Sequence, residues 1–245
     1  MFTFVKKSFL YLFLMPSYMV ALVPQVSEPI HRMQPLAIQH KPFERGSLSV
    51  ICGSMCSGKS EELIRTAGRF ILSGFHVLVF KPTIDTRTIL QLELDPLTYI
   101  SSRSGSWVEC IAVQNCTDMK KYTEQTDAQV IAIDEVMFFT HEADELIQLI
   151  NTLVAQGKKV MVAGLDLNFR GEPFGPMPQL LALADNVMKL TAICSVCGTD
   201  TYCITQRLVD GQPAHRNDPL IVVESSQKSI TYEPRCRKCH TLREN

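Results

Sequence analysis

The sequence lacks an excess of charge of either sign. Its 24 lysines and arginines are balanced by 25 aspartates and glutamates, so the formal net charge of the 245 residues is −1. No global field therefore draws the chain toward nucleic acid or anionic lipid, and we expect neither as a partner. Any polyanion that binds must be held by a local pocket, which favours a phosphate site over a nucleic-acid face.

The sequence also lacks an uninterrupted apolar run long enough to cross a membrane. Near the amino terminus, Lys6 and Lys7 precede the apolar residues 9–15, but Pro16 interrupts that run. We therefore predict no membrane association. Residues 1–46 are interpreted as an N-terminal extension that is disordered or dispensable. The alternatives are a secretory signal and a true start at Met33.

Disorder is excluded by the composition, which is 46% hydrophobic and 20% charged and has room for one ordinary domain and a small appendage. The nine cysteines are an odd number in a chain too long to be a disulfide-stapled miniprotein. Scattered cysteines of this kind are typical of core positions in a reducing compartment, so a cytoplasmic location is expected.

Four of the cysteines form two CxxC pairs, Cys194/Cys197 and Cys236/Cys239. Two such pairs can place four thiolates around a tetrahedral Zn²⁺ and leave no position open for water, which predicts a structural rather than a catalytic metal. His240 is an alternative fourth ligand, and four unligated cysteines are the other alternative. The zinc would close the intervening segment as a loop, within which the apolar run 220–223 is predicted to form a strand.

Residues 53–60 read GSMCSGKS and match the phosphate-binding pattern GxxxxGK[ST]. An apolar segment, 48–52, precedes the match, and residues 61–71 follow it with helical spacing, as this motif requires. Lys59 would reach the β- and γ-phosphates and the Ser60 hydroxyl would bind Mg²⁺. The phosphates would lie in a cradle of main-chain N–H groups, contributed by Gly53, Ser54, Met55, Cys56, Ser57 and Gly58.

Further buried strands are predicted at 76–80, 129–133 and 159–166, with a helix at 143–156. Strands that alternate with helices predict an α/β fold, a P-loop NTPase core whose parallel sheet is covered by helices. We assign this core to residues 47–190 and a small C-terminal zinc-ribbon or lasso domain to 191–245. Asp134 and Glu135 end the third strand, where one carboxylate can hold Mg²⁺ and the other can act on an attacking oxygen.

Over residues 47–242 the sequence resembles the zinc-containing, P-loop type of thymidine kinase. The resemblance rests on separate stretches that occur in the family's order. The most specific is GLDLNFRGEPFG (164–175), combined with the two CxxC pairs. The other stretches are GSMCSGKSEELI (53–64), KPTIDTR (81–87), SRSG (102–105), IDEVMFF (133–139), TQRL (205–208) and YEPRCRKCH (232–240). It implies transfer of phosphate from ATP to the 5′-hydroxyl of thymidine, and of deoxyuridine, in nucleotide salvage. It also implies a homotetramer that is inhibited by the end-product triphosphate.

The resemblance implies a role for each matching residue. Glu135 would be the general base, with Lys59 and Arg87 as the catalytic cations, and Asp85 and Asp134 would belong to the ATP and Mg²⁺ site. The walls of the base pocket would come from Phe138, Leu165, Phe169 and Tyr232. Thr205 would face the pyrimidine, and main-chain groups of a flap would bury it, at Val222, Val223 and Glu224.

Three departures from the family pattern bear on base selectivity. Met137 stands where the family usually has Gln, and Asn168 stands where Asp is usual. The flap tip, 224–231, is longer than usual and lacks the family's glycine. Two other functions remain open on the residues alone: a P-loop ATPase whose zinc ribbon handles nucleic acid, and a non-catalytic nucleotide-binding relative.

Overall fold

The computed structural model describes residues 43–86, 95–222 and 229–244. The predicted extension up to residue 42, and Arg87, Val223 and Glu224 among the predicted site residues, lie outside this part of the chain. A six-stranded sheet forms its centre, in the order β5-β2-β6-β7-β1-β8. Every neighbouring pair in this sheet is parallel, which confirms the predicted α/β class.

The central strands are short and, except for β8, largely buried, as expected where helices cover both faces of a parallel sheet. The four inner strands agree closely with the predicted ones: β2 (Val77–Pro82), β6 (Val130–Ile133), β7 (Lys159–Gly164) and β1 (Ser47–Cys52). The sheet ends in β5 (Ile111–Val113) and β8 (Asn186–Lys189), which the apolar pattern did not reveal.

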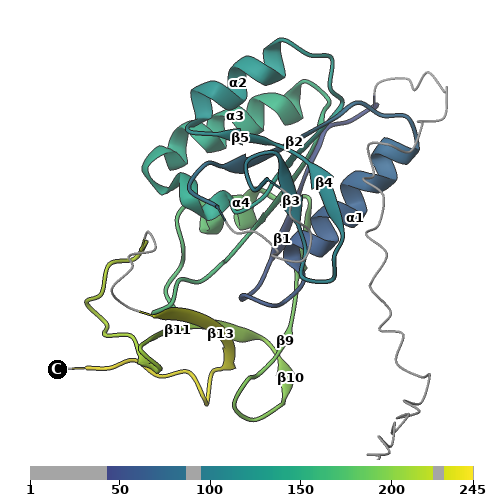
Figure 1. Cartoon of the computed structure of the whole chain (residues 1–245). Coiled ribbons are helices and arrows are strands. Elements are labelled where there is room, and N and C mark those ends of the chain that lie inside the picture. The colour runs from purple at the N-terminus through teal and green to yellow at the C-terminus, as the bar shows by residue number, and fades with distance from the viewer. Residues whose placement is uncertain (1–42, 87–94, 223–228, 245) are drawn as a thin grey trace, which may run out of the picture.

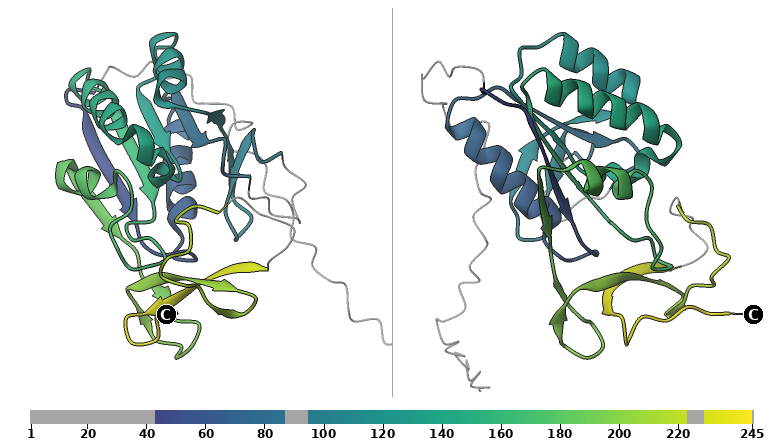
Figure 2. Two further views of the ribbon diagram at one scale, coloured as in Figure 1. Left: turned by 90° about the vertical axis from the view of Figure 1, so that its left-hand side faces the viewer. Right: turned by 180° about the vertical axis from the view of Figure 1, so that it is seen from behind.

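Helices cover both faces of the sheet (Figures 1 and 2), one on one face and three on the other among the described residues. α1 (Lys59–Leu72) packs Leu63, Ile64, Ala67 and Ile71 against alternate residues of the strands. The opposite face carries α2 (Cys116–Glu124), α3 (Ala143–Ala155) and α4 (Met177–Leu183). A 3-10 helix, η2 (Val136–Glu142), joins β6 to α3. Because successive side chains along a strand point to opposite faces of the sheet, the core is divided into two layers, one on each face.

A hairpin of β3 (Tyr99–Ser101) and β4 (Trp107–Glu109) packs beside α1. Phe43 also packs here, although it falls in the segment interpreted as an extension: its ring stacks on Phe75 with centroids 4.8 Å apart and meets Phe70 edge-on. The folded core therefore includes Phe43. No helix in the described part of the chain is long and apolar enough to cross a membrane.

The C-terminal residues form a separate group of small sheets below the central one (Figure 1). β9 (Ala192–Ile193) pairs with β10 (Asp200–Thr201), and β11 (Cys203–Val209) lies between β12 (Gln212–Pro213) and β13 (Ile230–Cys236). We call this group the zinc unit.

The strand predicted at 220–223 is wrong for its described residues. Residues 220 and 221 form a bend and Val222 is irregular. Leu220 and Ile221 instead lie partly buried against the larger core cluster. The reason is that the carbonyl groups of Pro219 and Leu220 accept hydrogen bonds from Arg207, which holds the segment away from any ladder.

Gly175 provides a test of how closely its loop packs against η2. Its φ of 51° is left-handed, and a Cβ there would lie 2.7 Å from both the Met137 carbonyl oxygen and Thr140 Oγ1. We expect Gly175→Ala to lower the free energy of unfolding by roughly 3 kcal/mol, through strain and overlap together. Urea denaturation measures the change. Gly211→Ala, at a left-handed turn with open space around it, is the control and should cost only about 1 kcal/mol. Equal costs would contradict the overlap.

Candidate active site and zinc centre

The P-loop joins β1 to α1 through two glycines in conformations that other residues rarely adopt. Gly53 has a φ of 143° and Gly58 a φ of 86°. A Cβ at Gly53 would also lie 2.7 Å from the Leu190 carbonyl oxygen. Gly58 has open space around it, so its backbone angle alone favours glycine there. The loop between them ends at the amino terminus of a 14-residue helix, the usual place for a phosphate group.

Two side chains at the start of α1 point to different partners. Lys59 is buried, and its Nζ donates to the Ser54 carbonyl oxygen at 2.7 Å. The Ser60 hydroxyl donates to Asp134 Oδ2 at 2.8 Å. Asp134 lies just after β6, so this bond connects residues 74 positions apart in the chain. The parallel sheet produces the contact because β1 and β6 both end at the same edge.

The Ser60 and Asp134 oxygens fit a Mg²⁺ ion. Two adjacent ligands of an octahedral Mg²⁺, each at 2.0–2.1 Å, are about 2.9 Å apart. The observed 2.8 Å is an ordinary hydrogen-bond length, and it is also close to the separation of two ligands on one such ion. Serine and aspartate oxygens are also hard ligands of the kind that Mg²⁺ prefers.

Glu135 lies next to this pair in a strained conformation. Its φ is 50°, which is uncommon for a residue with a side chain, and its N–H donates to Asp134 Oδ1 at 3.0 Å. Only 3% of Glu135 is exposed. A backbone held in this region beside a buried carboxylate is typical of residues whose side chain has a fixed direction in an active site.

Asp85 forms a buried ion pair that the sequence analysis missed. Lys81, at the end of β2, places its Nζ 2.9 Å from Asp85 Oδ2, and the two side chains are 2% and 7% exposed. The pair compensates part of the negative charge of the buried carboxylates at this sheet edge. The spacing of four residues in KPTID was the available signal, but neither spacing nor composition shows that a lysine is buried.

The predicted pocket residues fall into two groups. Phe138 and Leu165 are partly buried and pack against the larger core cluster beneath the sheet edge. Phe169 and Tyr232 both lie against the guanidinium of Arg207, which is 4.0 Å and 5.4 Å from the respective ring centroids. Aromatic rings at such an edge are suited to a flat heterocycle.

Thr205 connects the zinc unit to the P-loop. Its Oγ1 accepts a hydrogen bond from the Met55 N–H at 3.0 Å, and the side chain is buried. The P-loop and the strand that carries a predicted base contact are therefore in direct contact across 150 residues of sequence.

The two departures from the family pattern that can be located have structural roles. Met137 is 1% exposed and belongs to the core, where its sulfur would be 3.4 Å from a Cβ at Gly164. Asn168 Oδ1 accepts from the N–H groups of Arg170 and Glu172, at 2.8 and 3.2 Å. Asparagine thus organises the turn before residue 172 as an aspartate oxygen would.

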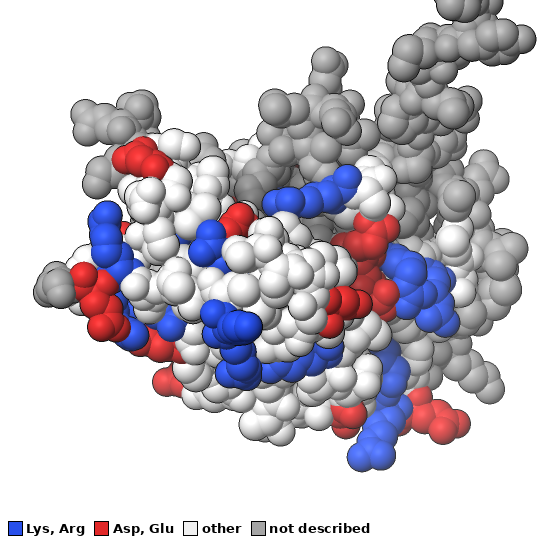
Figure 3. Space-filling view, turned by 90° about the horizontal axis from the view of Figure 1, so that it is seen from below, with Lys and Arg blue, Asp and Glu red and all other residues white. Residues whose placement is uncertain are grey.

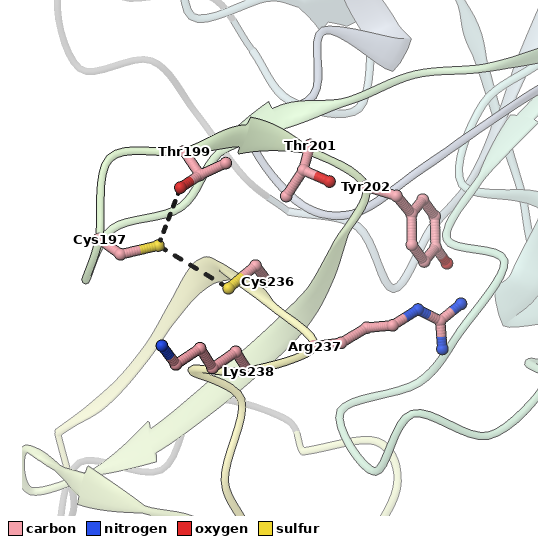
Figure 4. Close-up of a pocket in the computed structure, with 7 residues that line it drawn as sticks. All are labelled: Cys197, Thr199, Thr201, Tyr202, Cys236, Arg237 and Lys238. Atoms are coloured by element: carbon pink, nitrogen blue, oxygen red, sulfur yellow. Dashed lines mark hydrogen bonds between the residues drawn. The ribbon is translucent and has the colours of Figure 1, made fainter.

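The four CxxC cysteines converge at one end of the zinc unit. Their sulfur atoms all lie within 4.8 Å of one another. Four sulfurs at about 2.3 Å from a tetrahedral Zn²⁺ would be about 3.8 Å apart. The Sγ atoms of Cys197 and Cys236 are 3.8 Å apart and face each other (Figure 4). The residues present therefore fit a structural zinc ion.

Hydrogen bonding within the cluster affects its thiols in opposite directions. Backbone N–H groups at Cys236 and Cys197 lower the pKa of Cys194 to about 6, while hydrogen bonding with Cys236 raises the pKa of Cys239 to about 12. His240, the alternative ligand, is used elsewhere: its Nε2 donates to the Phe169 carbonyl oxygen at 2.9 Å. The second CxxC pair is thereby connected to the predicted base pocket.

Comparison with known proteins agrees with this geometry. A family model described as thymidine kinase matches residues 46–240. The chain belongs to the thymidine kinase family. Membership assigns it to the nucleoside kinases and implies ATP-linked Mg²⁺. Among solved structures, the chain is similar to the flagellar accessory protein FlaH from Methanocaldococcus jannaschii, at 19% identity and a TM-score of 0.43, over 66% of this chain and 77% of that one. At that score the likeness adds nothing to the argument.

The thymidine kinase zinc centre can be tested by removing one ligand. We expect Cys236→Ser to reduce bound zinc from about one ion per chain to well below half, because a serine oxygen is a poor substitute for a thiolate. Metal analysis of the purified protein gives the stoichiometry. Cys110→Ser, outside the cluster, is the control and should keep its zinc. Full zinc content in Cys236→Ser would exclude the four-cysteine site.

Proposed function

We propose that this protein is an ATP-dependent thymidine kinase, which transfers the γ-phosphate of ATP to the 5′-hydroxyl of thymidine, and of deoxyuridine, to form the monophosphate and ADP. The observation that carries the proposal is the Ser60–Asp134 hydrogen bond with Glu135 directly beside it. This arrangement supports a metal-binding pair next to a carboxylate that can accept a proton from a hydroxyl nucleophile.

The proposed roles follow the geometry of each group. The N–H groups of residues 53–58 hold the phosphates, and that of Met55 leaves the Thr205 hydroxyl to do so. Lys59 leaves the Ser54 carbonyl to pair with the transferred phosphate. Asp134 and Ser60 hold Mg²⁺, which supplies charge neutralisation when bound. Glu135 takes the proton from the 5′-hydroxyl. Asp85 and Arg87 complete the phosphate site, with Arg87 stabilising the charge of the transition state.

The nucleoside base would lie between the P-loop edge and the zinc unit. Phe138, Leu165, Phe169 and Tyr232 provide apolar walls, and Thr205 provides a hydroxyl. Main-chain groups at Val222, Val223 and Glu224 would bury the base. Burial of Met137 and the organising role of Asn168 support this assignment, since neither departure from the family pattern removes a polar group from the pocket.

We infer a homotetrameric enzyme of nucleotide salvage in the cytoplasm, with its kinase domain at 47–190, its zinc domain at 191–245 and no nucleic-acid or membrane partner. Exposed apolar side chains on the edge strand β8, Val187 and Met188, favour pairing with a second copy. Lysine, arginine, aspartate and glutamate are interspersed on the face of the zinc unit (Figure 3), which argues against a nucleic-acid surface.

Replacement of the proposed general base, Glu135, should lower turnover without changing ATP binding. We expect Glu135→Gln to lower kcat by about 10²-fold or more, because an amide cannot accept the hydroxyl proton. The Kd for Mg-ATP should change by less than about twofold. Steady-state kinetics and equilibrium titration give the two quantities. Glu109→Gln, an exposed position on β4, is the control. Unchanged turnover in Glu135→Gln would rule out its role as the base.

Substrate choice is tested by ADP release with Mg-ATP and thymidine, deoxycytidine, deoxyguanosine or no nucleoside. We expect release to depend on thymidine, because a pocket that pairs with the polar edge of one base leaves groups unpaired with another. Release that does not require a nucleoside would favour a P-loop ATPase instead. Tight ATP binding with no release for any nucleoside would favour a non-catalytic relative.

A further inference from the structure

Arg207 is a buried arginine for which neither the motif nor the proposed function supplies a role. It lies on β11 and is only 3% exposed. Its register partner on β13 is Tyr232. The guanidinium lies 4.0 Å from the centroid of the Phe169 ring and 5.4 Å from that of Tyr232. Two aromatic side chains from separate segments thus meet on one cation.

The hydrogen bonds of this guanidinium go to consecutive main-chain carbonyls. One terminal nitrogen donates to the Pro219 oxygen and the other to the Leu220 oxygen, each at 2.5 Å. Among the described residues no carboxylate forms an ion pair with Arg207, and its Nε has no hydrogen-bond partner there. The guanidinium is therefore oriented by the two carbonyl groups and the two rings, and its Nε donor is left without a partner among the described residues.

A second arginine extends this arrangement by one residue. The Arg170 guanidinium lies 5.2 Å from the Phe169 centroid and donates to the Asp218 oxygen at 2.8 Å. Three successive carbonyls, 218 to 220, are therefore held by cations that both contact one aromatic ring. Arg170 comes from the loop after β7 and is more exposed than Arg207, whose strand lies in the middle of its sheet.

The strand that carries Arg207 is itself firmly held. Gln206, on the opposite face of β11, exchanges two hydrogen bonds with the main chain of Thr241, at 2.8 and 2.9 Å. Thr205 is bonded to the P-loop. Arg207 therefore holds the segment 218–222 from a fixed position, and that segment leads directly into the proposed base flap.

We propose that Arg207 is a positioning residue for the nucleoside: it holds the 218–222 segment, Phe169 and Tyr232 in register before the substrate binds. This inference rests on the proposed function, because those groups are the proposed walls and flap of the base pocket. A lysine cannot replace it, since one ammonium group cannot donate to two carbonyls while lying flat on a ring. Loss of Arg207 leaves the phosphate site unchanged. It weakens nucleoside binding, because the free energy of ordering residues 218–222 must then be spent when the nucleoside binds.

The test combines kinetics with hydrogen exchange on the zinc-loaded, full-length protein. We expect Arg207→Met to raise the KM for thymidine about tenfold or more, with the KM for ATP within about twofold of wild type. Amide exchange in residues 214–222 should quicken about tenfold, whereas exchange in 54–60 stays the same. Arg207→Lys should show both effects to a smaller degree, and it decides the question if Arg207→Met does not fold.

Arg235→Met is the matched control, because Arg235 lies in the same three-stranded sheet but pairs with Glu233. It should keep wild-type values of both KM and exchange. Wild-type thymidine KM and exchange in a zinc-loaded Arg207 variant would overturn the proposal. So would an equal rise in both KM values with loss of zinc, which indicates a general structural role. If the wild type shows no thymidine-dependent turnover, the proposed function fails, and the exchange of 214–222 alone decides the role of Arg207.

Discussion

The hydrogen bond between Ser60 and Asp134 depends on the constraint that governs this molecule: parallel strands end at a common edge. β1 leads into the phosphate loop, β2 into the Lys81–Asp85 pair, and β6 into Asp134 and Glu135. Several buried carboxylates gather there, which is costly in a low dielectric unless cations are near. Buried Lys59 and Lys81 supply that compensation, so the edge is ready for a metal and a polyphosphate.

The zinc unit depends on the same edge but has little core of its own. Its cluster of buried apolar residues consists of Ala192 and three cysteines, with Cys239 partly buried beside them. So small a core gives the short strands little stability, which a metal ion held by the four cysteines would supply. Once held, the unit makes specific contacts with the kinase core, through Thr205 to the P-loop and through His240 to the Phe169 carbonyl. The four-cysteine site is thereby linked to residues of the proposed nucleoside pocket.

The departures from the family pattern show how context decides what a residue does. Met137 could be interpreted from the sequence only as a lost hydrogen bond, yet its side chain is buried in the core, with the sulfur near Gly164. Asn168 keeps the acceptor that its turn requires. The side-chain contact of Met137 is with Gly164, distant in the chain, whereas the contacts of Asn168 lie within four residues of it. The left-handed backbone of Glu135 is accompanied by a buried hydrogen bond from its N–H to the carboxylate of the adjacent Asp134.

The elements that could be predicted from the sequence are those with strong local patterns. Glycine spacing predicts the phosphate loop and apolar runs predict the inner strands, because each depends on residues close together in the chain. Each CxxC pair is local too, and the repeat of that spacing predicts a metal cluster. Three features could not be predicted in this way: residues 220–222 form no strand, Lys81 is buried against Asp85, and Arg207 contacts two aromatic rings and a loop. Those outcomes depend on which distant groups compete for the same donors and the same buried space, and that competition exists only once the chain has packed.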